Sequence, residues 1–100
     1  MPDLVKVFSI KLKEGSQDKA EEPVHQFAPQ GPAQEAGTRS FRVYRGCEES
    51  DYLLFVEHFA DRAAYDAHTS SSVYGDLIAG RFRDLVEGWS EVDHEVIVSV

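Results

Sequence analysis

The stretch YLLFVEHFA, residues 52–60, constrains the fold more than any other part of this sequence. It is an almost continuous apolar run of strand length, broken only by Glu57 and His58. A run of this kind is typical of a central β-strand with both faces covered. Alternation divides it into two faces, with Leu53, Phe55, Glu57 and Phe59 on one and Leu54, Val56 and His58 on the other. The fold must therefore provide a covering layer for each face of a sheet.

The other elements follow from periodicity and from residues that start or stop helices. Further strands are expected at residues 3–13, 40–46 and 94–100. Helices are expected from residue 17 onward, over residues 62–69 and over residues 74–88. Ser16 and Asp61 are good N-caps for the first two helices, and Gly88 stops the third. Prolines between residues 23 and 32 should kink the first helix or divide it into short pieces.

This order of elements predicts an α+β fold. A βαββαβ chain with a split second helix is typical of the ferredoxin-like arrangement, a four-stranded antiparallel sheet with helices on one face. The uncovered face and the apolar closing strand both need a partner, and a second copy of the chain would supply one. At 100 residues we expect a single domain, residues 1–100, that forms a dimeric α/β barrel as a homodimer.

Charge and composition exclude several functional classes. The formal net charge of −8 and the scattered basic residues argue against nucleic-acid binding. No apolar run approaches about 18 residues, so no membrane span is expected. The N-terminus MPDLVKVFSI lacks a signal-peptide pattern, which favours a cytoplasmic protein. The single cysteine, Cys47, excludes an internal disulfide, and neither a metal-ligand spacing nor a glycine-rich phosphate loop occurs.

A set of local motifs resembles a known family. The second strand begins Gly-Thr-Arg-Ser-Phe at residues 37–41, and the third ends Glu-His-Phe at residues 57–59. A short helix then ends Ala67-His68, and serines 70–72 link it to a longer helix. This combination resembles the antibiotic biosynthesis monooxygenase family of dimeric α+β barrels, over nearly the whole chain.

The resemblance implies a chemistry that can be compared position by position. Cofactor-free monooxygenases of this family oxidise quinol- or anthrone-like polyketides with molecular oxygen alone. The deprotonated substrate passes an electron to oxygen, and the protein binds the ring, stabilises the oxyanion and excludes water. An Asn, a Trp and a Tyr line their pocket, and these positions fall on Phe55, Phe59 and Tyr65. Only Tyr65 matches.

The haem-degrading branch of the family is a second enzymatic option. It requires an axial histidine on the longer helix, and that position holds Ile78, which cannot bind iron. We therefore expect no cofactor and no metal.

The candidate site residues lie around the third strand and the helix after it. Tyr65 and His68 share a helical face and are the candidate catalytic pair, because imidazole readily exchanges protons near neutral pH. The candidate substrate-binding residues are Phe27, Tyr44, Phe55, Glu57, Phe59 and Phe82. Structural alternatives are a bond from Glu57 to Arg42, and interface positions for His58 and Trp89.

Three functional hypotheses follow. The first is a monooxygenase-like oxidoreductase acting on a small aromatic, quinol or polyketide-type molecule in an apolar pocket. The second is a non-catalytic module of the same fold that binds a small molecule or serves as an accessory protein. The third is a polyketide cyclase or isomerase, for which one acid–base histidine would be enough.

Overall fold

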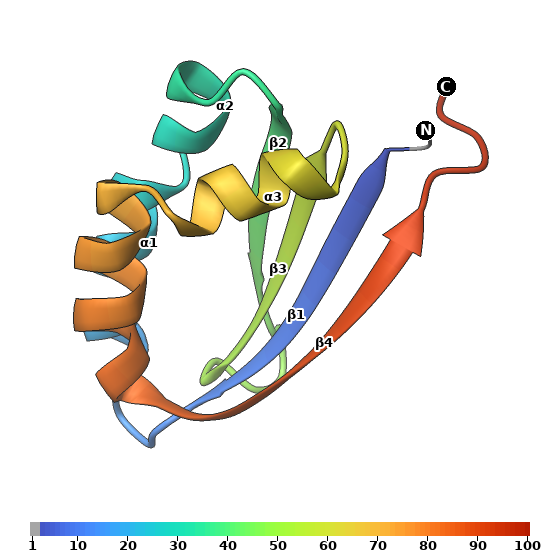
Figure 1. Cartoon of the computed structure of the whole chain (residues 1–100). Helices are drawn as coiled ribbons and strands as arrows, with labels where there is room; N and C mark the ends of the chain where they lie inside the picture. Colours follow the sequence, from blue (N-terminus) through green and yellow to red (C-terminus); the bar gives the residue numbers. More distant parts are fainter. Residues whose placement is uncertain (1–2) are drawn as a thin grey trace.

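The strands form one antiparallel sheet in the order β2-β3-β1-β4 (Figure 1). The structure is a computed structural model that describes residues 3–100. The strands are β1 (Leu4–Leu12), β2 (Thr38–Arg45), β3 (Tyr52–Phe59) and β4 (Val86–Glu95). The apolar run therefore forms a central strand, as predicted, with β1 and β2 as its neighbours.

All the helices lie on one face of this sheet (Figure 1). They are α1 (Gln17–Phe27), α2 (Gln30–Gln34), α3 (Arg62–Thr69), the π-helical η1 (Tyr74–Phe82) and the 3₁₀ turn η2 (Arg83–Leu85). This arrangement confirms the predicted ferredoxin-like α+β fold. Among residues 3–100, none of the helices has the length and apolar character needed to cross a bilayer.

The first helical region is divided as the prolines predicted, but at one position only. Helix α1 continues through the buried Pro23 and ends at Phe27 with Ala28 as its C-cap, and Pro29 then leads into α2. A proline is tolerated at the start of a helix, where its missing N–H has no intrahelical partner. The division therefore falls at Pro29.

The C-terminal third differs from the sequence prediction. The predicted helix over 74–88 ends at Leu85, and Gly88 lies within a strand. The closing strand is Val86–Glu95, whereas the prediction placed it at 94–100. Pairing of β4 with β1 defines this strand, with Ile10 opposite Trp89 and Phe8 opposite Glu91. The apolar residues of the tail led to the prediction of a strand there, but the tail lies beyond β4 and its Ile97 is 96% exposed.

The core fills the space between the sheet and the pair α1 and η1. Its buried side chains are Ile10, Leu12, Ala20, Val24, Phe27, Leu53, Phe55, Ile78 and Phe82. Asp61 caps α3 as predicted, because its side chain accepts a hydrogen bond from the Ala64 backbone N–H at 2.9 Å. Gly37 allows α3 to approach the sheet, since a Cβ there would lie 2.4 Å from the Ala64 Cβ. These contacts hold α3, and with it Tyr65 and His68, against the sheet.

Candidate active site

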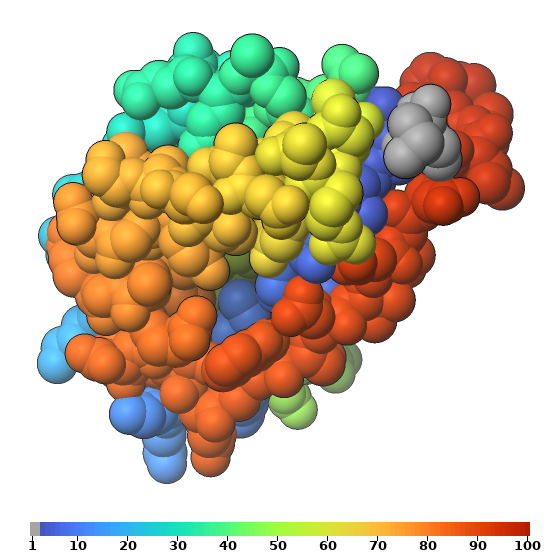
Figure 2. Space-filling model, in the orientation of Figure 1, coloured from blue at the N-terminus to red at the C-terminus, as the bar shows by residue number. Residues whose placement is uncertain are grey.

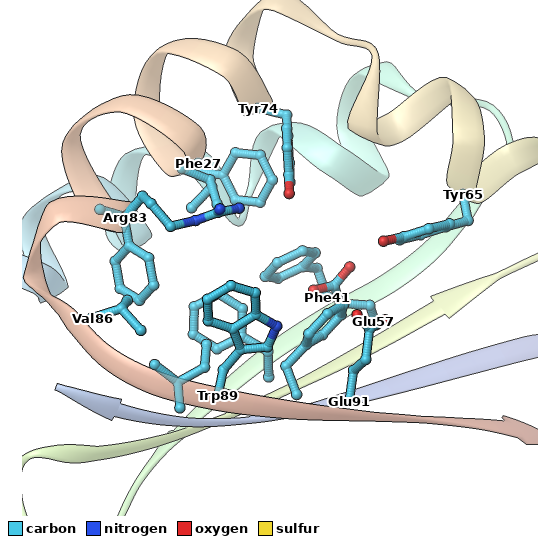
Figure 3. Close-up of a pocket in the computed structure, with 14 residues that line it drawn as sticks. Phe27, Phe41, Glu57, Tyr65, Tyr74, Arg83, Val86, Trp89 and Glu91 are labelled. Carbon is cyan, nitrogen blue, oxygen red and sulfur yellow. The ribbon is translucent and has the colours of Figure 1, made fainter.

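A cavity of about 130 Å³ lies between the sheet and the helices. In Figure 2 the surface is hollowed between β4 and the segment that carries α3 and η1. The walls are mainly aromatic and aliphatic, formed by Phe8, Ile10, Phe27, Phe41, Phe55, Ile78, Phe82, Val86 and Trp89. The polar lining residues are Glu57, Tyr65, Tyr74, Arg83 and Glu91 (Figure 3). An apolar cavity with a few convergent polar groups is the usual form of a small-molecule site.

Strand register and helix geometry bring these residues together. Phe8 pairs with Phe55 on one side and with Glu91 on the other, so all three project from the same face of the sheet. Across the cavity, Tyr74, Ile78 and Phe82 recur at every fourth position of η1. The π-helix is rare and is often found at functional sites.

Glu57 is the buried acid of the cavity wall. Its exposure is only 5%, and burial raises the pKa of its carboxyl from 4.5 to about 8. The Lys6 ammonium opposes this shift in pKa, whereas the nearby carboxylates of Glu35 and Glu91 add to it. Glu57 is therefore predominantly an uncharged carboxylic acid at neutral pH.

His68 lies directly beside Glu57 and is 1% exposed. Its Nδ1 is 2.8 Å from Glu35 Oε1, which also accepts a hydrogen bond of 2.8 Å from the Thr38 hydroxyl. Because a carboxylate accepts hydrogen bonds, this arrangement assigns the proton to Nδ1. Nε2 is buried without a hydrogen-bond partner among residues 3–100 and lies 3.7 Å from Glu57 Oε1. Glu35, His68 and Glu57 therefore connect the segment between α2 and β2 to the cavity.

Two tyrosine hydroxyls complete the polar lining. Tyr65 of α3 and Tyr74 of η1 both direct their hydroxyls into the cavity (Figure 3). Burial raises the pKa of Tyr65 above its ordinary value, although Lys6, whose Nζ lies 4.2 Å from the ring centroid, opposes this. Tyr65 is therefore a hydrogen-bond donor at neutral pH.

Lys6 neutralises acids on the neighbouring strand β4. It is 3% exposed, and its Nζ lies 3.0 Å from Glu91 Oε2 and 2.8 Å from Asp93 Oδ1. In the sequence Lys6 is the residue that interrupts the apolar alternation of the first strand. That interruption was the available signal for a buried cation on the helix-covered face of the sheet.

The structure brings together most of the predicted site residues. Five of them, Phe27, Phe55, Glu57, Tyr65 and Phe82, line the cavity. His68 lies behind Glu57 and outside the lining, and Phe59 is fully buried, with its ring centroid 5.3 Å from that of His68. Tyr44 is separated from them, because it pairs with Leu54 on the face away from the helices and is 48% exposed.

The structural alternatives have different outcomes. Arg42 is exposed and pairs with Val56 on the opposite face, so the suggested bond to Glu57 is wrong. His58 faces away from the cavity as predicted, and its Nε2 lies 2.8 Å from Asp3 Oδ2. Trp89 lines the cavity, and its interface position stays a prediction. Glu35, Phe41, Tyr74, Arg83 and Glu91 had not been recognised as site residues.

The fold and this site define a ferredoxin-like α+β domain with a buried acid and histidine beside an aromatic cavity. Residues 4–80 match the family model described as antibiotic biosynthesis monooxygenase. The chain therefore belongs to this family, which confirms the resemblance found in its motifs. No curated protein sequence matches the chain.

Solved structures share the fold over nearly the whole chain. A candidate antibiotic biosynthesis monooxygenase of Bacteroides thetaiotaomicron superposes with a TM-score of 0.89 and 16% identity, covering 97% of this chain and 91% of its own. A Shewanella oneidensis protein has a TM-score of 0.84 and 24% identity, with coverages of 95% and 91%. A Pseudomonas aeruginosa protein has a TM-score of 0.87 and 15% identity, with coverages of 98% and 97%. At these identities the likeness demonstrates the fold alone.

Proposed function

We propose that this chain is a cofactor-independent monooxygenase-like enzyme that acts on a small aromatic molecule of the quinol or polyketide type. One observation carries the proposal: the buried Glu57 lies at the wall of an aromatic cavity, 3.7 Å from the Nε2 of His68, which has no hydrogen-bond partner among residues 3–100. A buried acid beside a histidine can move a proton without a solvent molecule. Family membership supports oxygen chemistry, and the cavity lining supports an aromatic ligand.

The first step in this proposal is removal of a proton from a substrate hydroxyl. Glu57 accepts that proton on one oxygen while its own proton passes to His68 Nε2. Glu57 stays neutral, and the imidazolium is stabilised by the Glu35 carboxylate 2.8 Å from Nδ1. The substrate becomes an oxyanion, and the buried Glu57 does not become charged in this step.

Oxygen then reacts with the oxyanion. The electron-rich ring transfers one electron to O₂, the two radicals combine to form a C–O bond, and the O–O bond breaks with loss of water. A hydroquinone plus O₂ would thus give a hydroxyquinone plus H₂O. The hydroxyls of Tyr65 and Tyr74 would donate hydrogen bonds to the oxyanion as charge develops.

Oxygen consumption tests this proposal directly. The purified protein is incubated with a panel of hydroquinones and anthrones, and oxygen uptake is followed together with product formation. We expect uptake above the uncatalysed rate, reduced about tenfold in Tyr65→Phe because one oxyanion donor is lost. Tyr44→Phe is the matched control and should retain the parent rate, since Tyr44 lies on the opposite face of the sheet.

Two other results would contradict monooxygenation. Product formed equally fast without oxygen would identify an isomerase or cyclase, which the proton-transfer pair Glu57 and His68 could also serve. Saturable binding without any turnover would identify a binding or accessory module.

We also infer that the chain is a homodimer. Val7 pairs with Val56 on β3 and with Val92 on β4, so these valines form a row across the sheet face without helices. Val92 is 56% exposed, and the tail residue Val98 is 74% exposed. Apolar surface of this kind favours burial against a second copy.

Light scattering after size exclusion tests the homodimer. The mass should be near twice the 11.2 kDa of one chain, and Val92→Glu should shift it toward a single chain. Val98→Glu offers a second position in the tail, and a parent protein of single-chain mass would overturn the inference.

A further inference from the structure

Arg83 places a guanidinium at the cavity. It is the first residue of η2, and its Cζ lies 5.0 Å from the ring centroid of Trp89. Figure 3 shows the guanidinium directed into the cavity, on the side opposite Tyr65. Within the described chain, residues 3–100, no acidic side chain forms an ion pair with Arg83. The charge of this arginine is therefore available to a ligand.

The acids that line the cavity do not pair with Arg83. The lining contains two acids, Glu57 and Glu91. Glu57 is uncharged at neutral pH because burial raises its pKa to about 8, and Glu91 is paired with Lys6 at 3.0 Å. Among the described lining residues, Arg83 is therefore the charged side chain without a neutralising partner, within a chain whose formal net charge is −8. A guanidinium in this setting binds a carboxylate more strongly than a neutral group.

The volume of the cavity limits the size of its ligand. An engineered apolar protein cavity of about 150 Å³ holds one benzene molecule. A cavity of about 130 Å³ therefore accommodates one aromatic ring. Substituents must extend through the mouth, where Trp89 is 53% exposed and Arg83 is also exposed.

We propose that the ligand is a single-ring phenol that carries a carboxylate on a short arm, with the carboxylate bound by Arg83 and the ring stacked beside Trp89. The phenolic hydroxyl then points toward Tyr65 and Glu57, at the other side of the cavity. This inference rests on the proposed function, since it names the substrate class of the same site. It excludes tricyclic anthrones from the enclosed part of the cavity.

Binding of a matched pair of ligands tests the inference without requiring turnover. The probes are 4-hydroxyphenylacetate and its neutral amide, 4-hydroxyphenylacetamide, which have the same ring and arm. Affinity is measured by titration calorimetry and by the fluorescence of Trp89, the single tryptophan. We expect the acid to bind about tenfold more tightly than the amide, which corresponds to about 1.4 kcal/mol.

Arginine variants identify the source of this preference. Arg83→Gln should bring the affinity for the acid down to that for the amide, and Arg83→Lys should restore part of the difference. Arg81→Gln is the matched control, because Arg81 pairs with Glu22 of α1 at 3.2 Å and does not line the cavity. It should leave both affinities unchanged.

The inference fails if acid and amide bind equally, if neither binds up to its solubility limit, or if Arg83→Gln leaves the preference for the acid intact. Failure of the proposed function gives a different result. In that case the acid is still bound through Arg83, while oxygen uptake stays at the uncatalysed rate with every hydroquinone, including 2,5-dihydroxyphenylacetate.

Discussion

Replacing Glu57 with glutamine should stabilise the protein at pH 7 and also abolish most of its turnover. Burial raises the pKa of the Glu57 carboxyl from 4.5 to about 8. At pH 7 the unfolded chain holds this carboxyl ionised, whereas the folded chain must take up a proton to bury it. At pH 7 only the roughly 2.5 pKa units between 4.5 and 7 count, so at about 1.36 kcal/mol for each unit the buried carboxyl destabilises the parent protein by about 3 kcal/mol. Glutamine has nearly the same shape and carries no such penalty.

Because the pKa of Glu57 is raised on folding, the stability difference between the parent and Glu57→Gln should depend on pH in a defined way. Below pH 4.5 the carboxyl is protonated in both states, so the parent and Glu57→Gln should be about equally stable. Between pH 4.5 and about 8 the folded state binds more protons, so the parent loses stability relative to the variant as the pH rises. Above about pH 8 both states are ionised and the difference becomes constant.

Urea unfolding of both proteins from pH 4 to pH 9 measures this difference. Glu48→Gln, in the exposed turn between β2 and β3, is the control and should show no comparable pH-dependent gain. Oxygen uptake by Glu57→Gln should fall by about a hundredfold, since the amide cannot relay a proton to His68. A variant that is less stable than the parent at pH 7, or a difference that does not change with pH, would contradict the assignment of Glu57 as a buried neutral acid.

Alternation and capping predicted most of the fold because those signals are local. The faces of β3, the cap at Asp61 and the central position of the apolar run all depend on residues close in sequence. Strand β4 could not be found in this way. Its inward-facing Glu91 and Asp93 are charged because they neutralise the buried Lys6, and a sequence pattern assigns such acids to the solvent face.

The candidate site was predictable where a residue type was unusual for its position. Glu57 stands out as an acid within an apolar strand, and Tyr65 lies one helical turn before His68. Glu35 gave no such signal, because its contact with His68 joins residues 33 positions apart through an irregular segment after α2. Arg83 was missed because the predicted helix extended past the point where η2 turns into β4.

Replacing His68 with alanine should lower the free energy of unfolding by about 2–4 kcal/mol. The imidazole is 1% exposed, and its ring centroid lies 5.2–5.8 Å from those of Phe27, Phe41, Phe59 and Tyr74. Alanine would leave a cavity among these rings and remove a hydrogen-bond partner of Glu35. The exposed His25 on α1 provides the control, and His25→Ala should change the stability by less than about 0.5 kcal/mol.

Asparagine at position 68 separates the structural role of this histidine from its chemical role. Its side-chain amide can replace Nδ1 as a donor to Glu35, but it supplies nothing in place of Nε2 opposite Glu57. His68→Asn should therefore recover at least about 1 kcal/mol of the stability lost in His68→Ala, while its oxygen uptake stays as low as that of the alanine variant. Denaturant unfolding and oxygen-electrode measurements on the same preparations give both values. If the asparagine variant regains turnover in proportion to its stability, His68 is a packing and hydrogen-bonding residue and the proton does not pass through Nε2.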